Sequence, residues 1–431
     1  MADRFGYPTL TALVVANMIG AGVFTTSGFA LADLQTPARV LAAWAVGGAL
    51  ALAGALSYAA LARRLTDSGG EYLFLSRALH PAAGYVGGCV SLLAGFTGAI
   101  AFAASALEAY LVPASSRPAW LPPDVIAIAA VVAAGVLHGR TRCLGAQAQN
   151  VVVACKLALI VAVFAWAAHR GLAGAWRGGP LLATDGHSAP FDPLAFAQSV
   201  MWVSLSYSGF NAAVYVAGEA RDPARNVPRA IVTGTVLVTV LYLALNTVFV
   251  LAPPRAAVAG FEDVAGRALG ALGGAPLEAA VRAIVVLALA SSVSSMIMAG
   301  PRVYARMAAD GVLPGWLRAG EDAPSAAVAL QVVLAVIVIR VAGLESLLSY
   351  LGFTLSLSAA LTVTSLFVLR AREGAAAVPI TGYPWVPALY VGATLAIAGL
   401  AAWRRPLEPL VGLATIGLGL LAWWLGARRR A

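Results

Sequence analysis

The sequence predicts an all-α integral membrane protein with about twelve transmembrane helices. Of its 431 residues, 61% are hydrophobic and only 11% are charged, whereas soluble domains carry roughly 25% charged residues. Apolar runs of roughly 20 residues, the length that crosses a bilayer as a helix, recur from end to end. The polar stretches between them are short, so residues 1–431 are expected to form one transmembrane domain in the lipid bilayer.

The apolar runs follow each other closely along the chain, and each run has the length of one membrane crossing. The predicted spans are 9–33, 39–62, 82–112, 123–138, 146–168, 193–218, 229–252, 279–308, 326–342, 346–369, 386–403 and 408–426.

The positive net charge of +9 is interpreted as membrane topology and not as nucleic-acid binding. Arginines in the loops are more numerous on the side that holds both chain ends, and cytoplasmic loops carry such an excess. We therefore expect both termini to be cytoplasmic, with the chain in the plasma membrane, or inner membrane, of a bacterial cell. The three cysteines and four histidines show no metal-ligand spacing, so no cofactor is expected.

The first span carries an interruption. It contains Asn17-Met-Ile-Gly-Ala-Gly-Val-Phe, and its Gly20 and Gly22 each disfavour a helix by about 1 kcal/mol relative to alanine. Unwound backbone at this depth is tolerated where it lines a cavity or is buried in protein. Close helix packing through small residues is the alternative explanation.

The sixth span repeats the signal. Its Gly209 lies between the polar side chains of Ser206, Ser208 and Asn211, which are costly in lipid unless they face partners or a cavity. Matching interruptions in two halves of a chain are typical of an inverted-repeat transporter, with its binding site at the breaks.

The chemistry of such a site follows from the ends of broken helices. The half-helix after the first break exposes N–H groups near Ala21, Gly22 and Val23, which suit a carboxylate. Carbonyls freed around Leu205, Ser206 and Ser208 suit an ammonium. Together they predict a clamp for an α-amino acid, although the helix dipole alone would also suit other small anions.

Lysine is nearly absent from this chain. Among its 28 Lys and Arg residues only Lys156 is a lysine, and it lies inside the apolar fifth span. An intramembrane charge is a functional hypothesis by default, and a lysine, unlike arginine, can lose its proton when buried. A fixed cation and a proton-coupling group are both open for Lys156.

Two further side chains flank the second break. Phe210 and Asn211 are candidate substrate contacts, and an interhelical hydrogen bond is the alternative for Asn211. No acidic residue falls near the middle of a predicted span. The glutamates that come nearest, Glu108, Glu278 and Glu345, all lie near span ends. This favours neutral substrates over cationic ones.

Four stretches resemble the amino acid–polyamine–organocation superfamily. They are Asn17 to Phe24, the loop from Thr66 to Leu75, the sixth span with its following loop from Tyr207 to Ile231, and Ser291 to Pro314. The Gly-Phe-Asn element and Gln149-Asn150…Lys156 are most similar to the L-type amino acid transporter branch.

The resemblance implies a LeuT-type five-plus-five inverted repeat with helices 1 and 6 broken. The repeats would be 9–168 and 193–369, followed by two additional helices in 386–426. It implies that Gly20 and the three residues after it bind carboxylate, and that the carbonyls of Leu205, Ser206 and Ser208 bind the amino group. Lys156 would take the place of a sodium ion, with Ser292 as a partner, and Leu205 stands where relatives often have an aromatic gate.

The expected function is therefore secondary active transport of amino acids, with neutral L-amino acids as the expected substrates, without sodium and by exchange or proton coupling. A cationic amino acid or polyamine antiporter and a non-transporting amino acid sensor are the alternatives. An enzyme is disfavoured, because no catalytic constellation is present at depth. No disulfide-linked subunit is expected, and the chain is expected to work as a monomer.

Overall fold

The computed structural model describes residues 5–140, 146–178, 190–309, 311, 313–318 and 325–428. Apart from one bridge between Phe5 and Ala220, the regular structure of these residues is helical. The elements are α1 (Tyr7–Met18), α2 (Ala21–Leu34), α3 (Pro37–Arg64), α4 (Gly70–Ala78), α5 (Pro81–Val90), η1 (Ser91–Gly98), α6 (Ala99–Leu111), η2 (Ala114–Ser116), α7 (Val125–Arg140), α8 (Ala146–Leu172), α9 (Pro193–Ser206), η3 (Ala212–Glu219), α10 (Pro223–Leu251), α11 (Arg255–Val258), α12 (Val264–Ala309), η4 (Gly315–Leu317), α13 (Ser325–Val341), α14 (Leu344–Glu373), α15 (Trp385–Arg404) and α16 (Leu407–Arg428).

The predicted all-α membrane fold is confirmed. Each of the twelve predicted spans coincides with one or more helices. Among the described residues, eight helical segments are long and apolar enough to cross a membrane, and three shorter apolar helices accompany them. The third span is one continuous segment, Pro81–Leu111, whose middle part η1 is a π-helix.

Both predicted helix breaks are present. The first lies between α1 and α2, where Ile19 leaves the helical conformation and Gly20 is extended. The second follows α9, where the chain turns through Gly209, whose φ of +96° is a conformation that favours glycine, before the 3-10 helix η3 begins.

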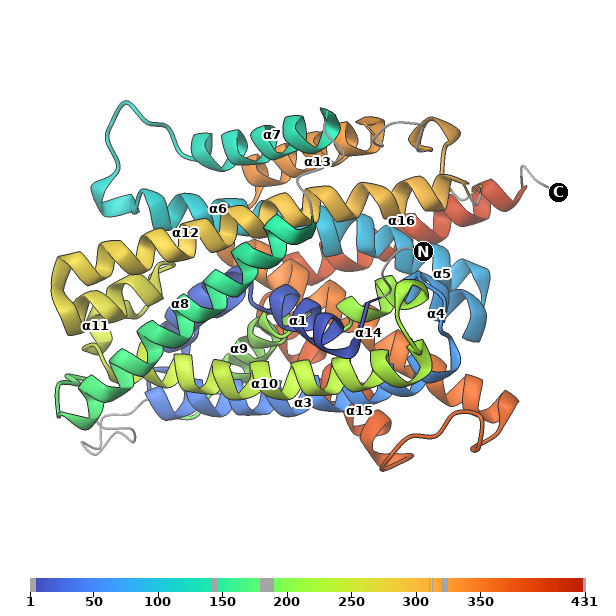
Figure 1. Cartoon of the computed structure of the whole chain (residues 1–431), viewed down its shortest axis with the longest axis horizontal. Helices are drawn as coiled ribbons and strands as arrows, with labels where there is room; N and C mark the ends of the chain where they lie inside the picture. Colours follow the sequence, from blue (N-terminus) through green and yellow to red (C-terminus); the bar gives the residue numbers. More distant parts are fainter. Residues whose placement is uncertain are drawn as a thin grey trace.

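The broken helices lie among long, unbroken ones. Helix α10 packs against both α3 and α1, and α9 packs against α2, α3, α14 and α15. Figure 1 shows α4 and both chain ends at one end of the molecule, with α11 at the opposite end. We call these the terminal end and the distal end.

One predicted boundary differs markedly from the structure. The eighth span was expected from residue 279, yet α12 begins at Val264 and continues across a kink at Gly274, where φ is +75°. The added first part, residues 264–278, is rich in alanine and glycine and contains Arg267 and Pro276. Its sequence therefore does not indicate a membrane-spanning helix. Together with α11 it covers the distal end beside α2.

Candidate functional site

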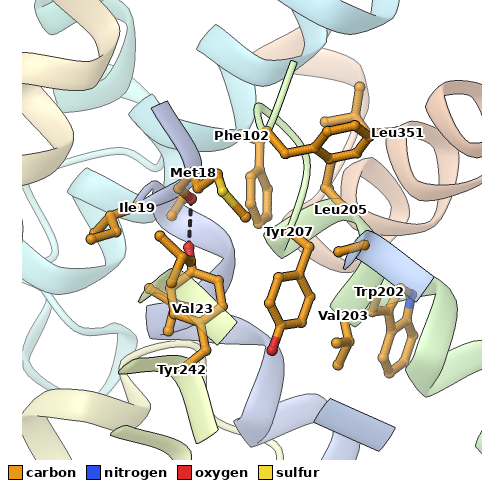
Figure 2. Close-up of a cluster of buried hydrophobic side chains, with 14 of the residues drawn as sticks. Met18, Ile19, Val23, Phe102, Trp202, Val203, Leu205, Tyr207, Tyr242 and Leu351 are labelled. Carbon is orange, nitrogen blue, oxygen red and sulfur yellow. Dashed lines mark hydrogen bonds between the residues drawn. The ribbon is translucent and has the colours of Figure 1, made fainter. Parts of the chain in front are cut away.

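The two helix breaks lie directly against each other (Figure 2). A methyl group on Gly22 would come within 2.4 Å of the Ser206 hydroxyl oxygen and 2.8 Å of the Ser206 Cα. A methyl group on Gly209 would come within 2.9 Å of the carbonyl oxygen of Asn17. These two glycines are therefore required by close contact between α2 and α9 and between the second break and α1.

The start of α2 is a buried helix N-terminus. Gly20 is its N-cap residue and supplies no side chain, and Ala21, Gly22 and Val23 form its first turn. All three first-turn residues are buried, and first-turn N–H groups have no acceptor within their own helix. The residues predicted to bind a carboxylate therefore lie at the positive end of the α2 dipole, and carboxylate binding there stays a prediction.

A tyrosine from a third helix joins the two breaks. The fully buried Tyr242 of α10 donates its hydroxyl hydrogen to the carbonyl of Met18, the last residue of α1, as drawn in Figure 2. The same hydroxyl lies 3.2 Å from the carbonyl oxygen of Ser206, the last residue of α9. Both broken helices thus direct a terminal carbonyl at one hydroxyl group.

The predicted ammonium-binding carbonyls are only partly free. The Leu205 carbonyl accepts the backbone N–H of Ser208 at 2.9 Å, and the Ser206 carbonyl faces Tyr242. Each carbonyl oxygen has two lone pairs, so each retains capacity for a second donor. The Ser206 hydroxyl is 3.1 Å from the Thr26 hydroxyl of α2, which adds a polar contact between the two half-helices.

Further side chains hold α2 in place from behind. The Trp44 indole of α3 donates to the Ser27 hydroxyl at 2.8 Å, and Ser27 donates to the side-chain oxygen of Asn246 on α10. Tyr207, which follows α9, donates to the Trp44 carbonyl at 3.3 Å. The buried polar groups on this face of α2 are thus bonded to α3 and α10, which fixes the position of the half-helix.

The side chain of Leu205 is buried in an apolar cluster. Figure 2 draws it in one cluster with Phe102 of α6 and Leu351 of α14. These residues form an apolar wall beside the breaks. Position 205 itself contributes no aromatic ring to this wall, whereas Phe102 does.

Phe210 and Asn211 face a different group of side chains. The Phe210 ring packs edge-on against Tyr58 of α3, with ring centroids 5.2 Å apart. The Asn211 side-chain amide donates to a carboxylate oxygen of Glu71 on α4 at 3.2 Å. Asn211 therefore makes an interhelical hydrogen bond, the alternative considered from sequence, and its role toward substrate stays a prediction.

The predicted cation site is described only in part. Lys156 lies on α8, and its side chain lies outside the described residues. Helix α8 packs against α12 and α10. Ser292 of α12 is half-buried and donates its hydroxyl to the Ala288 carbonyl of the preceding turn at 3.0 Å. The pairing of Lys156 with Ser292 stays a prediction.

Sequence reasoning overlooked two residues at this site, Tyr242 and Glu71. Tyr242 lies within an apolar run, and nothing in the sequence distinguishes it there from a tyrosine that only packs against neighbouring side chains. Glu71 lies in a polar loop sequence, yet its side chain is only 8% exposed. A signal was present for Glu71, since it is one of two acidic residues, with Asp67, in the loop from Thr66 to Leu75 that carries the family resemblance. The sequence of this loop does not indicate which of the two is buried.

The distal end is closed over α2. Gly28 of α2 lies against the loop between α11 and α12, so closely that a methyl group on it would overlap the Phe261 carbonyl oxygen. The Gly28 carbonyl accepts the Gly260 N–H of this loop at 2.8 Å. Asp263 pairs with Arg282 of α12, which also pairs with Glu278 at 2.7 Å. The loop between α11 and α12 is therefore anchored as a lid on the distal side of the breaks.

The sequence matches the family model described as amino acid permease over residues 5–408. A serine/threonine exchanger of Bacillus subtilis is 24% identical over 404 residues, which cover 90% of this chain and 88% of the exchanger. The human large neutral amino acids transporter small subunit 2 is 24% identical, over 99% of this chain and 81% of that protein.

A third relative matches over a shorter region. The b(0,+)-type amino acid transporter 1 of Mus musculus is 28% identical over 241 residues, which cover 55% of this chain. The match spans 49% of that transporter, or about half its length.

Proposed function

Because this chain belongs to the amino acid permease family, we propose that it transports amino acids across the membrane by alternating access at the two helix breaks. The observation that carries this proposal is the meeting of opposite helix ends at one buried point. The start of α2 offers N–H groups, and α1 and α9 end in carbonyls that converge on Tyr242. An α-amino acid has the complementary pair of charges.

Neutral L-amino acids are the proposed substrates. The described contacts at the breaks come from hydroxyl, amide, aromatic and aliphatic groups, with Glu71 reached only through Asn211. A site that selects a cationic side chain would more readily place a carboxylate against it. The names of the serine/threonine exchanger and of the large neutral amino acids transporter subunit support the same substrate class.

Transport is proposed to be independent of sodium, with the Lys156 ammonium in place of a coupling ion. Lys156 lies on α8, a helix packed against the α12 that carries Ser292. The bacterial inner membrane, with both termini in the cytoplasm, is the proposed location, supported by the arginine distribution along the loops. In this topology the terminal end faces the cytoplasm.

The test is uptake of a panel of radiolabelled amino acids into proteoliposomes that contain the purified protein. The panel is run with and without internal amino acid, with and without sodium, and with and without a pH gradient. Uptake of neutral amino acids that is accelerated by internal amino acid and indifferent to sodium is expected. A sodium requirement would contradict the role of Lys156, and absence of any amino acid uptake would contradict the proposed function.

Lys156→Ala separates the proposed ion role from the transport activity. Loss of uptake in this variant, with the elution volume of the wild type on size exclusion, supports Lys156 as the resident cation. Uptake at the wild-type rate in Lys156→Ala would remove Lys156 from the mechanism.

A further inference from the structure

A buried carboxylate ties four parts of the molecule together at the terminal side of the breaks. Glu71 Oε1 accepts the Tyr58 hydroxyl of α3 at 2.6 Å and the Asn211 amide at 3.2 Å, while Oε2 accepts the Ser358 hydroxyl of α14 at 2.7 Å. We call Glu71, Tyr58, Asn211 and Ser358 the Glu71 cluster. It joins α3 and α4 to the segment after the second break and to α14.

The partners of Glu71 in the described structure are all uncharged. Tyr215 of η3 and Tyr390 of α15 are the other titratable groups near it, and both are neutral phenols. Helix α14 also brings Arg372 to α4, but its guanidinium bonds to the carbonyl of Ala78, at the far end of α4. Helix α5, which also packs on α4, has no Asp, Glu, Lys or Arg.

Burial without a nearby cation disfavours the charged form of a carboxyl group. Burial accordingly raises the pKa of Glu71 above its ordinary value, while the hydrogen bonds from Tyr58, Ser358 and Asn211 act in the opposite direction and are weaker. The desolvation is a property of the closed arrangement. Water reaching the cluster would remove it and restore ordinary acidity.

The hydrogen-bond geometry accepts a neutral carboxyl group without rearrangement. A proton on Oε2 can be donated to the Ser358 oxygen, because a serine hydroxyl can turn from donor to acceptor. Oε1 then keeps both of its donors, Tyr58 and Asn211. The cluster can therefore hold Glu71 in either charge state.

We propose that Glu71 is a proton-binding site whose protonation is linked to closure of the terminal end. Closing this end forms an O–H bond on Oε2 with a proton from the adjacent solution, and opening it returns that proton to the same solution. This proposal rests on the proposed transport function and adds to it a second ligand, a proton, at a site separate from Lys156. Acid on the terminal side stabilises the closed state and slows the cycle.

A transport-independent measurement tests the site itself. Infrared spectra of the purified wild type and of Glu71→Gln are compared across a pH series, in the region of the carbonyl stretch of a protonated carboxylic acid. A wild-type band that persists after the exposed carboxyl groups have ionised, and is lost in Glu71→Gln, is expected. Identical spectra for the two proteins at every pH would overturn the proposal, whether or not transport is observed.

The functional consequence is tested by amino acid exchange in proteoliposomes with the protein oriented by its accessible terminus. Wild-type exchange is expected to fall as the pH on the terminal side is lowered. Glu71→Gln, which resembles the protonated group, is expected to exchange at the wild-type acid rate at every pH. Glu373→Gln is the matched control, since Glu373 lies at the terminal end in an ion pair with Arg64, and it should keep the wild-type profile.

A second variant keeps this test informative if Glu71→Gln does not fold. Tyr58→Phe removes one donor to the carboxylate and leaves Glu71 in place, so the midpoint of the pH profile should move to higher pH. A midpoint that does not move in Tyr58→Phe, or a Glu71→Gln profile equal to that of the wild type, overturns the inference. Absence of exchange in the wild type would instead count against the proposed transport function, and the infrared test would still decide the proton site.

Discussion

Tyr242 is the residue that most directly explains how two broken helices coexist in a buried place. The last carbonyls of α1 and of α9 have no N–H donor within their own helix. One phenol hydroxyl lies within hydrogen-bond distance of both Met18 and Ser206. The Met18 carbonyl also accepts the Gly20 N–H at 2.9 Å, so of the two carbonyls it is that of Ser206 that depends on Tyr242 for a donor. A buried carbonyl left without a donor is costly.

Tyr242→Phe should therefore destabilise the protein by about 1–3 kcal/mol, the typical cost of an unsatisfied buried polar group. The measurement is the thermal unfolding of the purified protein in detergent. Tyr7→Phe is the matched control, because the Tyr7 hydroxyl bonds to Thr233 at an exposed position. Equal unfolding temperatures for Tyr242→Phe and Tyr7→Phe would show that the bridge contributes nothing.

Gly22 and Gly20 provide a comparison within one motif. A methyl group on Gly22 would overlap both the side chain and the backbone of Ser206, while a methyl group on Gly20 would meet nothing within 4 Å. Gly22→Ala should force α2 and α9 apart, and we expect lower thermal stability together with loss of transport. Gly20→Ala should unfold near the wild-type temperature, and the opposite order of the two variants would contradict the described contact.

At the scale of elements, the two half-helices are held by long neighbours and not by their own ends. Helix α2 is fixed by Trp44 of α3 and Asn246 of α10 through Ser27. The segment after α9 is fixed by α4 through Glu71 and Asn211. Contacts of this kind can be released on one side of the breaks without disturbing the other side.

The Glu71 cluster makes the stability of the protein depend on pH in a defined direction. Because burial raises the pKa of Glu71 in the folded state, the folded protein holds this proton more tightly than the unfolded chain does. Between the two pKa values the unfolded chain ionises while the folded protein does not, so the wild type loses about 1.4 kcal/mol of stability per pH unit.

Glu71→Gln has no proton to lose at this position. Its stability relative to the wild type should therefore increase as the pH rises above 4.5, the ordinary value for glutamate, and should level off above the folded-state pKa. Chemical or thermal unfolding across a pH series measures the difference. A difference that decreases with rising pH would show that the folded-state pKa is lowered.

At the scale of the whole molecule, contacts between separate helices hold the protein on both sides of the breaks. The lid between α11 and α12 rests on Gly28 at the distal end, and the Glu71 cluster joins α4 to α14 at the terminal end. Alternating access requires that the two closures open one at a time.

The sequence predicted those parts of this architecture that local signals encode. Gly20, Gly22 and Gly209 disfavour helix where they stand, so both breaks could be located. The Tyr242 bridge could not be predicted, because it joins residues 224 positions apart in the chain. The burial of Glu71 likewise depends on Ser358, 287 positions away, and no local pattern in a polar loop indicates it.

The boundaries of the two repeats, 9–168 and 193–369, and the role of Lys156 remain predictions from sequence. The repeat boundaries describe an internal symmetry between the two halves of the chain, and contacts between individual residues do not test such a symmetry. The side chain of Lys156 lies outside the described residues, so its partners are left to the sodium and Lys156→Ala experiments.

We propose that the two breaks bind the carboxylate and the ammonium of one amino acid. Thermal stabilisation of the purified protein by a neutral L-amino acid tests it most directly, when compared with the N-acetyl and methyl ester derivatives of the same amino acid. We expect stabilisation by the free amino acid and by neither derivative, because each derivative lacks one of the two charges. Equal stabilisation by either derivative would contradict the two-charge site.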